Sequence, residues 1–227
     1  MRWIVTLFAG FAFLGHAQGH VLDEYLQATY IAIQPHRIDV EINMTPGVEV
    51  FQKVLRLIDG NGDGKITEQE MRAYAESVLS SASLNLDGSA KPIEFARVTL
   101  PARADLEAGL GTICIQAKSP VAFLAAGRHH VEFRNAHAAS ISVYQVNALV
   151  PSSSAIRITK QDRDRLQREY RMDFEVSRNL NNAGDYLLGG SIGGLIALAI
   201  GLVRQRRASI SELEQFHKNC GPSQPLT

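Results

Sequence analysis

Apolar and polar residues alternate along most of the chain between residues 28 and 176. In residues 36–43, for example, Ile38, Val40 and Ile42 fall on one face, and the charged residues between them fall on the other. A period of two is typical of a half-buried strand. The pattern predicts nine strands, at 28–34, 36–43, 83–86, 92–100, 112–118, 129–135, 141–150, 155–159 and 168–176. Short strands separated by turn residues favour a mainly β fold, an antiparallel β-sandwich.

One segment, residues 46–80, departs from this alternation. Thr45 and Pro46 have the chemistry of a helix N-cap and first turn. Apolar residues then recur at helical spacing: Val50, Phe51, Val54, Leu57 and Ile58 before residue 59, and Met71, Tyr74, Val78 and Leu79 after residue 70. We therefore expect two helices, joined by a loop and inserted into the β domain.

The loop, residues 59–70, reads DGNGDGKITEQE. It matches the EF-hand motif, in which oxygen atoms at fixed positions surround Ca²⁺ and a glycine at position six makes the sharp turn, here Gly64. The six expected ligands are the side chains of Asp59, Asn61 and Asp63, the backbone carbonyl of Lys65, Thr67 directly or through water, and both carboxylate oxygens of Glu70. The sequence therefore predicts a Ca²⁺ site between the two helices.

Two further features of the loop bear on its neighbours. Thr67 and Glu70 have the spacing of a capping box at the start of the second helix. EF-hand motifs usually occur in pairs that meet at position eight, which is Ile66 here, and no second loop is present in the sequence. Ile66 could pair with an edge of the sandwich, pair with another molecule, or stay free. We expect the sandwich edge.

The N-terminal residues 1–19 resemble a secretory signal. Arg2 precedes a short apolar run, and small residues follow it, so a cut after Ala17 or after Gly19 is expected. A retained anchor is the alternative. Removal of this segment would leave residues 20–178 as the exported domain.

The other end contains an uncharged apolar stretch, residues 186–203, followed by RQRR. As a helix it would be roughly 27 Å long, close to the thickness of a bilayer core. We expect a polar stalk at 179–185, one transmembrane helix at 186–203, and a cytoplasmic tail at 204–227 behind the arginines. These assignments predict a single-pass inner-membrane protein with its main domain outside; a buried core helix at 186–203 is the alternative.

Small residues line one face of that apolar stretch. They are spaced four apart, at Gly189, Gly193, Ala197 and Gly201. Such a stripe lets two membrane helices approach closely, so it predicts either a homodimer or a membrane partner. The alternative is a glycine-rich span without a partner.

Charge and motifs narrow the remaining function classes. The chain has 23 basic and 23 acidic residues and a formal net charge of zero, so no basic surface for nucleic acid is expected. The sequence contains no motif typical of serine hydrolases (G-x-S-x-G), zinc peptidases (H-E-x-x-H) or phosphate-binding loops. We therefore expect a binding protein and not an enzyme.

Copper or nickel binding is the main alternative to calcium. Cleavage after Gly19 would make His20 the N-terminus, whose amine and imidazole could chelate such a metal. A second histidine would be needed. His129 and His130 are adjacent on a predicted strand, with His129 facing inward and His130 outward, and His36 and His137 fall in predicted turns.

Four segments resemble a group of bacterial exported domains. They are HVLDEYLQATYIAI at 20–33, MTPGVEV at 44–50, GLGTICI at 109–115, and SVYQVNALVPSSSAIRITKQDRDRLQ at 142–167. These domains are similar to the extracytoplasmic parts of membrane proteins related to hydrogenase and urease accessory permeases. The resemblance implies an envelope-anchored, extracytoplasmic calcium-binding domain. We expect a membrane-anchored calcium-binding protein in which calcium braces or regulates an interaction domain. A transition-metal accessory role in the cell envelope is the alternative.

Overall fold

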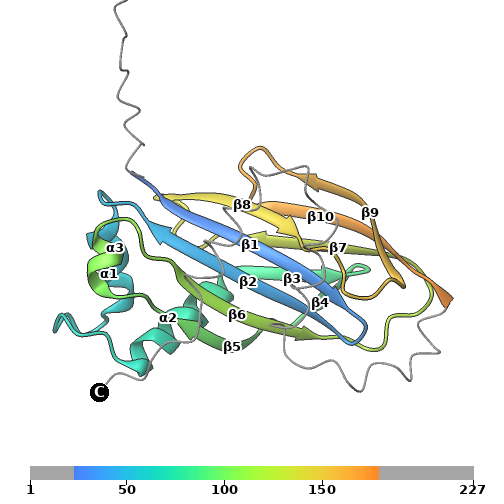
Figure 1. Ribbon diagram of the computed structural model, residues 1–227, viewed down its shortest axis with the longest axis horizontal. Coiled ribbons are helices and arrows are strands. Elements are labelled where there is room, and N and C mark those ends of the chain that lie inside the picture. The colour runs from blue at the N-terminus through green and yellow to red at the C-terminus, as the bar shows by residue number, and fades with distance from the viewer. Residues whose placement is uncertain (1–22, 179–227) are drawn as a thin grey trace, which may run out of the picture.

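The computed structural model describes residues 23–178 (Figure 1). This part of the chain contains ten strands and three helices. In chain order they are β1 (Tyr25–Gln34), β2 (Arg37–Pro46), α1 (Phe51–Ile58), α2 (Glu68–Ser80), β3 (Ala82–Leu86), β4 (Ser89–Lys91), β5 (Glu94–Thr99), α3 (Arg103–Glu107), β6 (Ile113–Pro120), β7 (Gly127–Asn135), β8 (Ser142–Ala148), β9 (Ile156–Arg163) and β10 (Glu169–Val176).

The strands form two five-stranded sheets. One has the order β5-β6-β2-β1-β8 and the other β4-β3-β7-β10-β9. The expected mainly β fold is therefore confirmed. One pair, β1 with β8, is parallel, which differs from the expected all-antiparallel arrangement. The chain reaches β8 from β7 of the other sheet, so no hairpin fixes the direction in which β8 joins β1.

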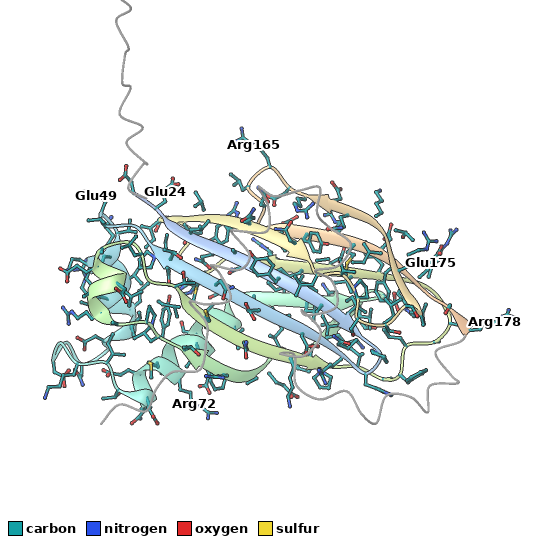
Figure 2. The ribbon with its side chains drawn as sticks, in the orientation of Figure 1. Glu24, Glu49, Arg72, Arg165, Glu175 and Arg178 are labelled. Atoms are coloured by element: carbon teal, nitrogen blue, oxygen red, sulfur yellow. The ribbon has the colours of Figure 1, made fainter. Side chains whose placement is uncertain are left out.

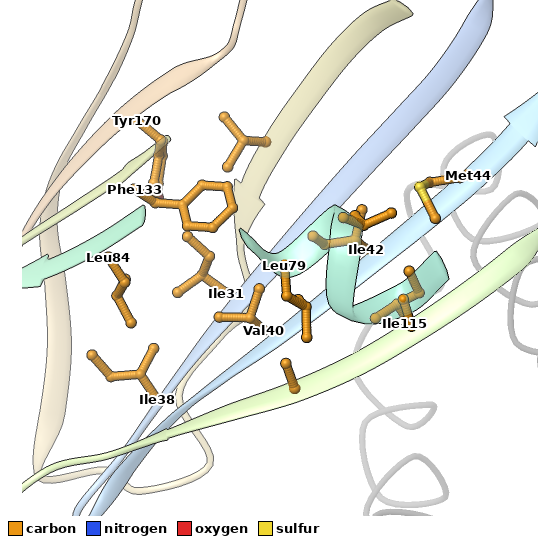
Figure 3. Packing of buried hydrophobic residues seen from close by; sticks show 14 of the residues in the cluster. Ile31, Ile38, Val40, Ile42, Met44, Leu79, Leu84, Ile115, Phe133 and Tyr170 are labelled. Carbon is orange, nitrogen blue, oxygen red and sulfur yellow. The ribbon is translucent and has the colours of Figure 1, made fainter. Parts of the chain in front are cut away.

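The two sheets and the helices share one hydrophobic core (Figure 3). Ile38, Val40 and Ile42 are at most 1% exposed, so the alternation in residues 36–43 correctly identified the buried face. Tyr170 and Phe174 of β10 enter the core from the other sheet. Each such large apolar side chain contributes about 1.5–3 kcal/mol when fully buried.

The helical insertion begins later than its sequence indicated. Thr45 and Pro46 belong to β2, where Pro46 lies opposite Tyr25 of β1. A turn with a hydrogen bond from Val50 N to Gly47 O follows, and α1 begins at Phe51 without a side-chain cap. Strand pairing with β1 therefore overrides the local N-cap signal, and the expectation of a helix from residue 46 was wrong by five residues.

The helices gather at one end of the sheets (Figure 1). Helix α2 contacts α1, β3 and β5, and α3 contacts β2. This end, which we call the loop end, contains the segment 59–70. The opposite end contains the β1–β2 turn and the end of β10.

Several expectations concern residues that the structure does not describe. Within residues 23–178, no helix has the length and apolar character needed to cross a membrane. The expected signal at 1–19, stalk at 179–185, transmembrane helix at 186–203 and tail at 204–227 lie outside the described residues. The stripe of Gly189, Gly193, Ala197 and Gly201 lies outside them as well.

Candidate metal centre

The candidate metal centre is the loop between α1 and α2. Helix α1 buries Phe51, Val54, Leu55 and Ile58, and α2 buries Tyr74, Ala75, Val78 and Leu79. Leu57, expected on the buried stripe, is 47% exposed, and Leu55 takes its place in the core. Both helices therefore pack into the core through these residues, and most of the loop between them is exposed at the surface.

Asp59 organises the first half of the loop. Its backbone N–H donates to Leu55 O at 2.8 Å, so it ends α1. Its side chain accepts from Gly62 N at 2.7 Å and from Gly64 N at 2.8 Å. Gly64 has a φ of +81°, the conformation expected for position six and one that costs glycine little. The carboxylate of Asp59 therefore already holds the sharp turn in place.

The next two predicted ligands also hold local backbone groups. Asn61 Oδ1 accepts from Asp63 N, and Asp63 Oδ1 accepts from Lys65 N, each at 2.8 Å. Short polar side chains that bond to the backbone two residues ahead stabilise consecutive tight turns. The backbone of residues 59–65 is curled around its own oxygen atoms by these bonds.

Glu70 connects the two ends of the loop. Its Oε2 accepts from Thr67 N at 2.9 Å and from Thr67 Oγ1 at 2.8 Å, and Thr67 Oγ1 accepts in turn from Glu70 N at 3.2 Å. The predicted capping box is therefore confirmed. The other oxygen, Oε1, accepts from Asn61 N at 3.4 Å. Hydrogen bonds from the backbone and side chain of Thr67 lower the pKa of Glu70, which keeps it ionised.

Lys65 and Ile66 complete the loop. Lys65 contributes its carbonyl to the predicted ligand set, and its side chain is exposed. Ile66 lies outside every described strand, and its partly buried side chain packs against the core. The expected pairing of Ile66 with a sheet edge is therefore not observed; Ile66 joins the loop to the domain by side-chain packing.

Arg103, which the sequence did not single out, also contacts the loop. Its Nη1 donates to Gly64 O at 2.8 Å from the start of α3. Helix α3 is itself held tightly. Leu106 is 1% exposed, and a Cβ on Gly111 would lie 2.9 Å from Leu106 N, so only glycine fits there. Residues 64 and 103 are 39 positions apart, and no local pattern could have revealed their contact.

The donor set is suited to a hard cation, although its carboxylates are not gathered. Asp59, Asp63 and Glu70 each face backbone N–H groups of the loop, and within residues 23–178 no three His, Cys, Asp or Glu side chains are grouped closely enough to hold a metal ion between them. Carboxylate, amide, hydroxyl and carbonyl oxygens are nevertheless the ligands that Ca²⁺ prefers. An ionised carboxylate has about four lone-pair sites, so Asp59 and Asp63 can coordinate an ion while they keep these N–H bonds.

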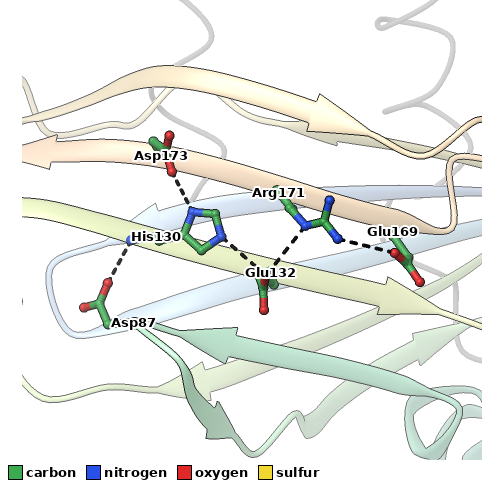
Figure 4. A network of polar contacts seen from close by, with 6 residues as sticks. All are labelled: Asp87, His130, Glu132, Glu169, Arg171 and Asp173. Carbon is green, nitrogen blue, oxygen red and sulfur yellow. Dashed lines mark hydrogen bonds and ion pairs between the residues drawn. The ribbon is translucent and has the colours of Figure 1, made fainter.

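The histidines considered for copper or nickel are dispersed in the structure. His129 Nδ1 contacts Asp87 Oδ2 at 2.7 Å. His130 points to the other face of β7, where its Nδ1 contacts Asp173 Oδ1 at 2.6 Å, within a network of charged residues (Figure 4). The predicted opposite orientation of these two side chains is confirmed. His36 lies against Phe123, and His20 is outside the described residues.

Neither protein-family models, nor curated proteins, nor solved structures include a match to this chain. The EF-hand pattern and the similarity to exported domains therefore remain predictions from the sequence.

Proposed function

We propose that residues 59–70 bind one Ca²⁺ ion, and that the ion braces α1 against α2 in an exported, membrane-anchored domain. The observation that carries this proposal is the position of Glu70. Its carboxylate extends from the first turn of α2 to Asn61 N in the first half of the loop, and Thr67 keeps it ionised. An ion bound by Asp59 and Glu70 would link the end of α1 directly to the start of α2.

Helix electrostatics support this arrangement. Asp59 is the C-cap of α1, where backbone carbonyls give a partial negative charge that favours a cation. Glu70 lies in the first turn of α2, where a carboxylate is favoured. The ion would be held by Asp59, Asn61, Asp63, the carbonyl of Lys65, Thr67 and Glu70, and it would act as a structural cross-link.

The expected strength of binding makes calcium a conditional brace. Extracellular EF-hand modules bind Ca²⁺ with a Kd of about 10⁻⁴–10⁻³ M. At a Kd of about 10⁻⁴ M, calcium near 1 mM would add roughly 1.4 kcal/mol to the free energy of unfolding. Occupancy would then follow changes in calcium outside the cell, and the brace would regulate how firmly α2 is held for a partner protein.

Titration calorimetry of the full chain in detergent micelles tests the site. Wild-type protein should bind one Ca²⁺, and Glu70→Gln should lose most of this binding while far-UV circular dichroism shows intact strands. Glu68→Gln is the matched control, because it removes the same charge from the same exposed helix turn without removing a ligand. Unchanged binding by Glu70→Gln would refute the assignment. Tight binding of Cu²⁺ or Ni²⁺ in place of Ca²⁺ would favour the transition-metal alternative.

A further inference from the structure

Three connections meet at the end of the sheets opposite the helices, where β10 also ends. We call this the stalk end; it comprises residues 35–36, 121–126, 149–155 and 177–178. Hydrogen bonds join these segments: Val121 N to His36 O at 3.0 Å, Leu124 N to Pro35 O at 3.1 Å, Ser152 Oγ to Gln34 Oε1 at 2.9 Å, and Ser177 N to Ala155 O at 2.8 Å. Figure 2 shows Arg178 at this end and Glu49 at the other.

The stalk end exposes apolar side chains on uncharged loops. The β6–β7 connection reads VAFLAA and the β8–β9 connection reads LVPSSSA. Val150 is 91% exposed, Leu149 44% and Phe123 39%. Surface loops are usually polar, so exposed apolar side chains on two loops that both bond to the β1–β2 turn favour a surface that contacts something other than water.

Basic residues stand on the strands next to these loops. Arg37, Arg128 and Arg157 stand at the starts of β2, β7 and β9, and Arg178 follows β10, whereas the acids at this end are Asp39, Asp87 and Glu175. The side chains of Arg128 and Arg157 are 90% and 70% exposed, although both contact Glu175. The stalk end therefore combines a positive charge with an apolar tip.

The loop end has the opposite charge. Residues 23–24, 47–70 and 101–111 carry the acids Asp23, Glu24, Glu49, Asp59, Asp63, Glu68, Glu70, Asp105 and Glu107, which outnumber the basic Lys53, Arg56, Lys65 and Arg103. Exposed apolar residues occur here too, such as Leu110 at 73%. An anionic surface would thus attract one end of the domain and repel the other.

The chain length beyond β10 limits how far the stalk end can be from a membrane. This step rests on the proposed anchoring by residues 186–203. Seven residues, 179–185, separate Arg178 from that segment, and they span at most roughly 25 Å when fully extended. The ten residues of β1 alone extend about 34 Å toward the loop end. The stalk end is therefore the end held nearest to the bilayer.

We propose that the stalk end docks on the surface of an anionic phospholipid membrane. Phe123, Leu149 and Val150 enter the interfacial region, and the arginines contact lipid phosphates. This orientation directs the loop at 59–70 away from the membrane, where calcium and a partner protein have access to α1 and α2.

Tryptophan fluorescence of the full chain in vesicles tests the orientation. In a Trp3→Phe background, which removes the one native tryptophan, Val150→Trp is placed in phosphatidylcholine–phosphatidylglycerol vesicles with or without brominated acyl chains. If the tryptophan at position 150 lies about 5–10 Å deep in the membrane interface, its emission should shift to the blue, and bromine should quench roughly half of it. Leu110→Trp, exposed at the loop end, is the matched control and should not be quenched.

The outcomes separate orientation from anchoring. Quenching of Val150→Trp alone, weaker when phosphatidylglycerol is omitted, supports the proposal. The docking is overturned if both positions are quenched equally. It is also overturned if position 150 is not quenched in protein that stays in the vesicles after an alkaline wash. Neither result affects the proposed anchor. Loss of the protein from the vesicles in that wash overturns both, while calcium titration of the same sample still tests the loop.

Discussion

The hydroxyl groups of Tyr25 and Tyr74 lie 2.6 Å apart inside the core and join the first strand of the domain to α2, the helix that follows the loop at 59–70. Both side chains are at most 3% exposed. Tyr74 Oη is also 3.3 Å from His137 Nε2, and Met44 Sδ is near both hydroxyls. Burial raises the pKa of both tyrosines, so they remain neutral. This contact gives α2 a polar attachment to the sheets.

Replacement of Tyr74 by phenylalanine should weaken that attachment. The Tyr25 hydroxyl would keep only the thioether of Met44 as a buried partner, and we expect a loss of about 1–3 kcal/mol in the free energy of unfolding, measured by urea denaturation. In a double-mutant cycle, Tyr25→Phe and Tyr74→Phe should be non-additive because they share one hydrogen bond. Additive effects would show that the two hydroxyls do not interact. Tyr170→Phe, whose hydroxyl contacts Gln161 near the surface, is the control and should cost less.

The buried imidazole of His137 should make the protein less stable in acid. Burial lowers the pKa of His137 to about 4 from an ordinary value near 6.5. The unfolded chain therefore binds a proton at higher pH than the folded protein does, and the stability present above pH 6.5 is lost as the pH falls through 4. A shift of this size corresponds to roughly 3 kcal/mol. Urea unfolding between pH 7.5 and 4 should show a shallower decline in His137→Gln than in the wild type, and parallel curves would contradict this assignment.

His129 should have the opposite pH dependence. Burial opposes its charge, but hydrogen bonds to Ala125 O and to the Asp87 carboxylate outweigh burial and raise its pKa. The stability contributed by the protonated ring is full below the unfolded pKa and is lost as the pH rises through the folded pKa. Asp87→Asn should therefore destabilise the protein more at pH 6 than at pH 8.5, and should lower the pKa of His129 measured by NMR. An unchanged NMR titration would exclude the pairing.

The sequence predicted local features and missed contacts between distant segments. Alternation identified the buried face of β2, and spacing identified the capping box of Thr67 and Glu70 and the turn at Gly64, because neighbouring residues determine these features. It placed the start of α1 at Pro46, because nothing local reveals that β2 stays paired with β1 up to that residue. The parallel entry of β8, and the contacts of Tyr25 with Tyr74 and of Arg103 with Gly64, depend on how the two sheets are connected.

The contact between Arg103 and Gly64 leads to the final prediction, that α3 holds the loop at 59–70 in position for calcium. Arg103 Nη1 bonds the carbonyl of Gly64, and Asp63 Oδ1 accepts the N–H of Lys65 at the other end of the same peptide group. The peptide before the Lys65 carbonyl, a predicted ligand, is thus fixed at both ends. In a paired EF-hand a second loop would brace this part of the loop, and we predict that α3 does so here.

Two replacements of Arg103 separate positioning from charge. Arg103→Met removes both, and if positioning dominates it should weaken calcium binding by about three- to tenfold, the equivalent of one hydrogen bond. Arg103→Lys keeps a charged donor and should bind nearly as the wild type does. If the arginine only repelled the ion, Arg103→Met would bind calcium more tightly. Arg56→Met, which removes an exposed charge from the last turn of α1, is the control and should not weaken binding.

Without calcium, hydrogen exchange at the Lys65 amide should be faster in Arg103→Met. An unchanged exchange rate there, together with unchanged calcium affinity, would show that α3 does not brace the loop.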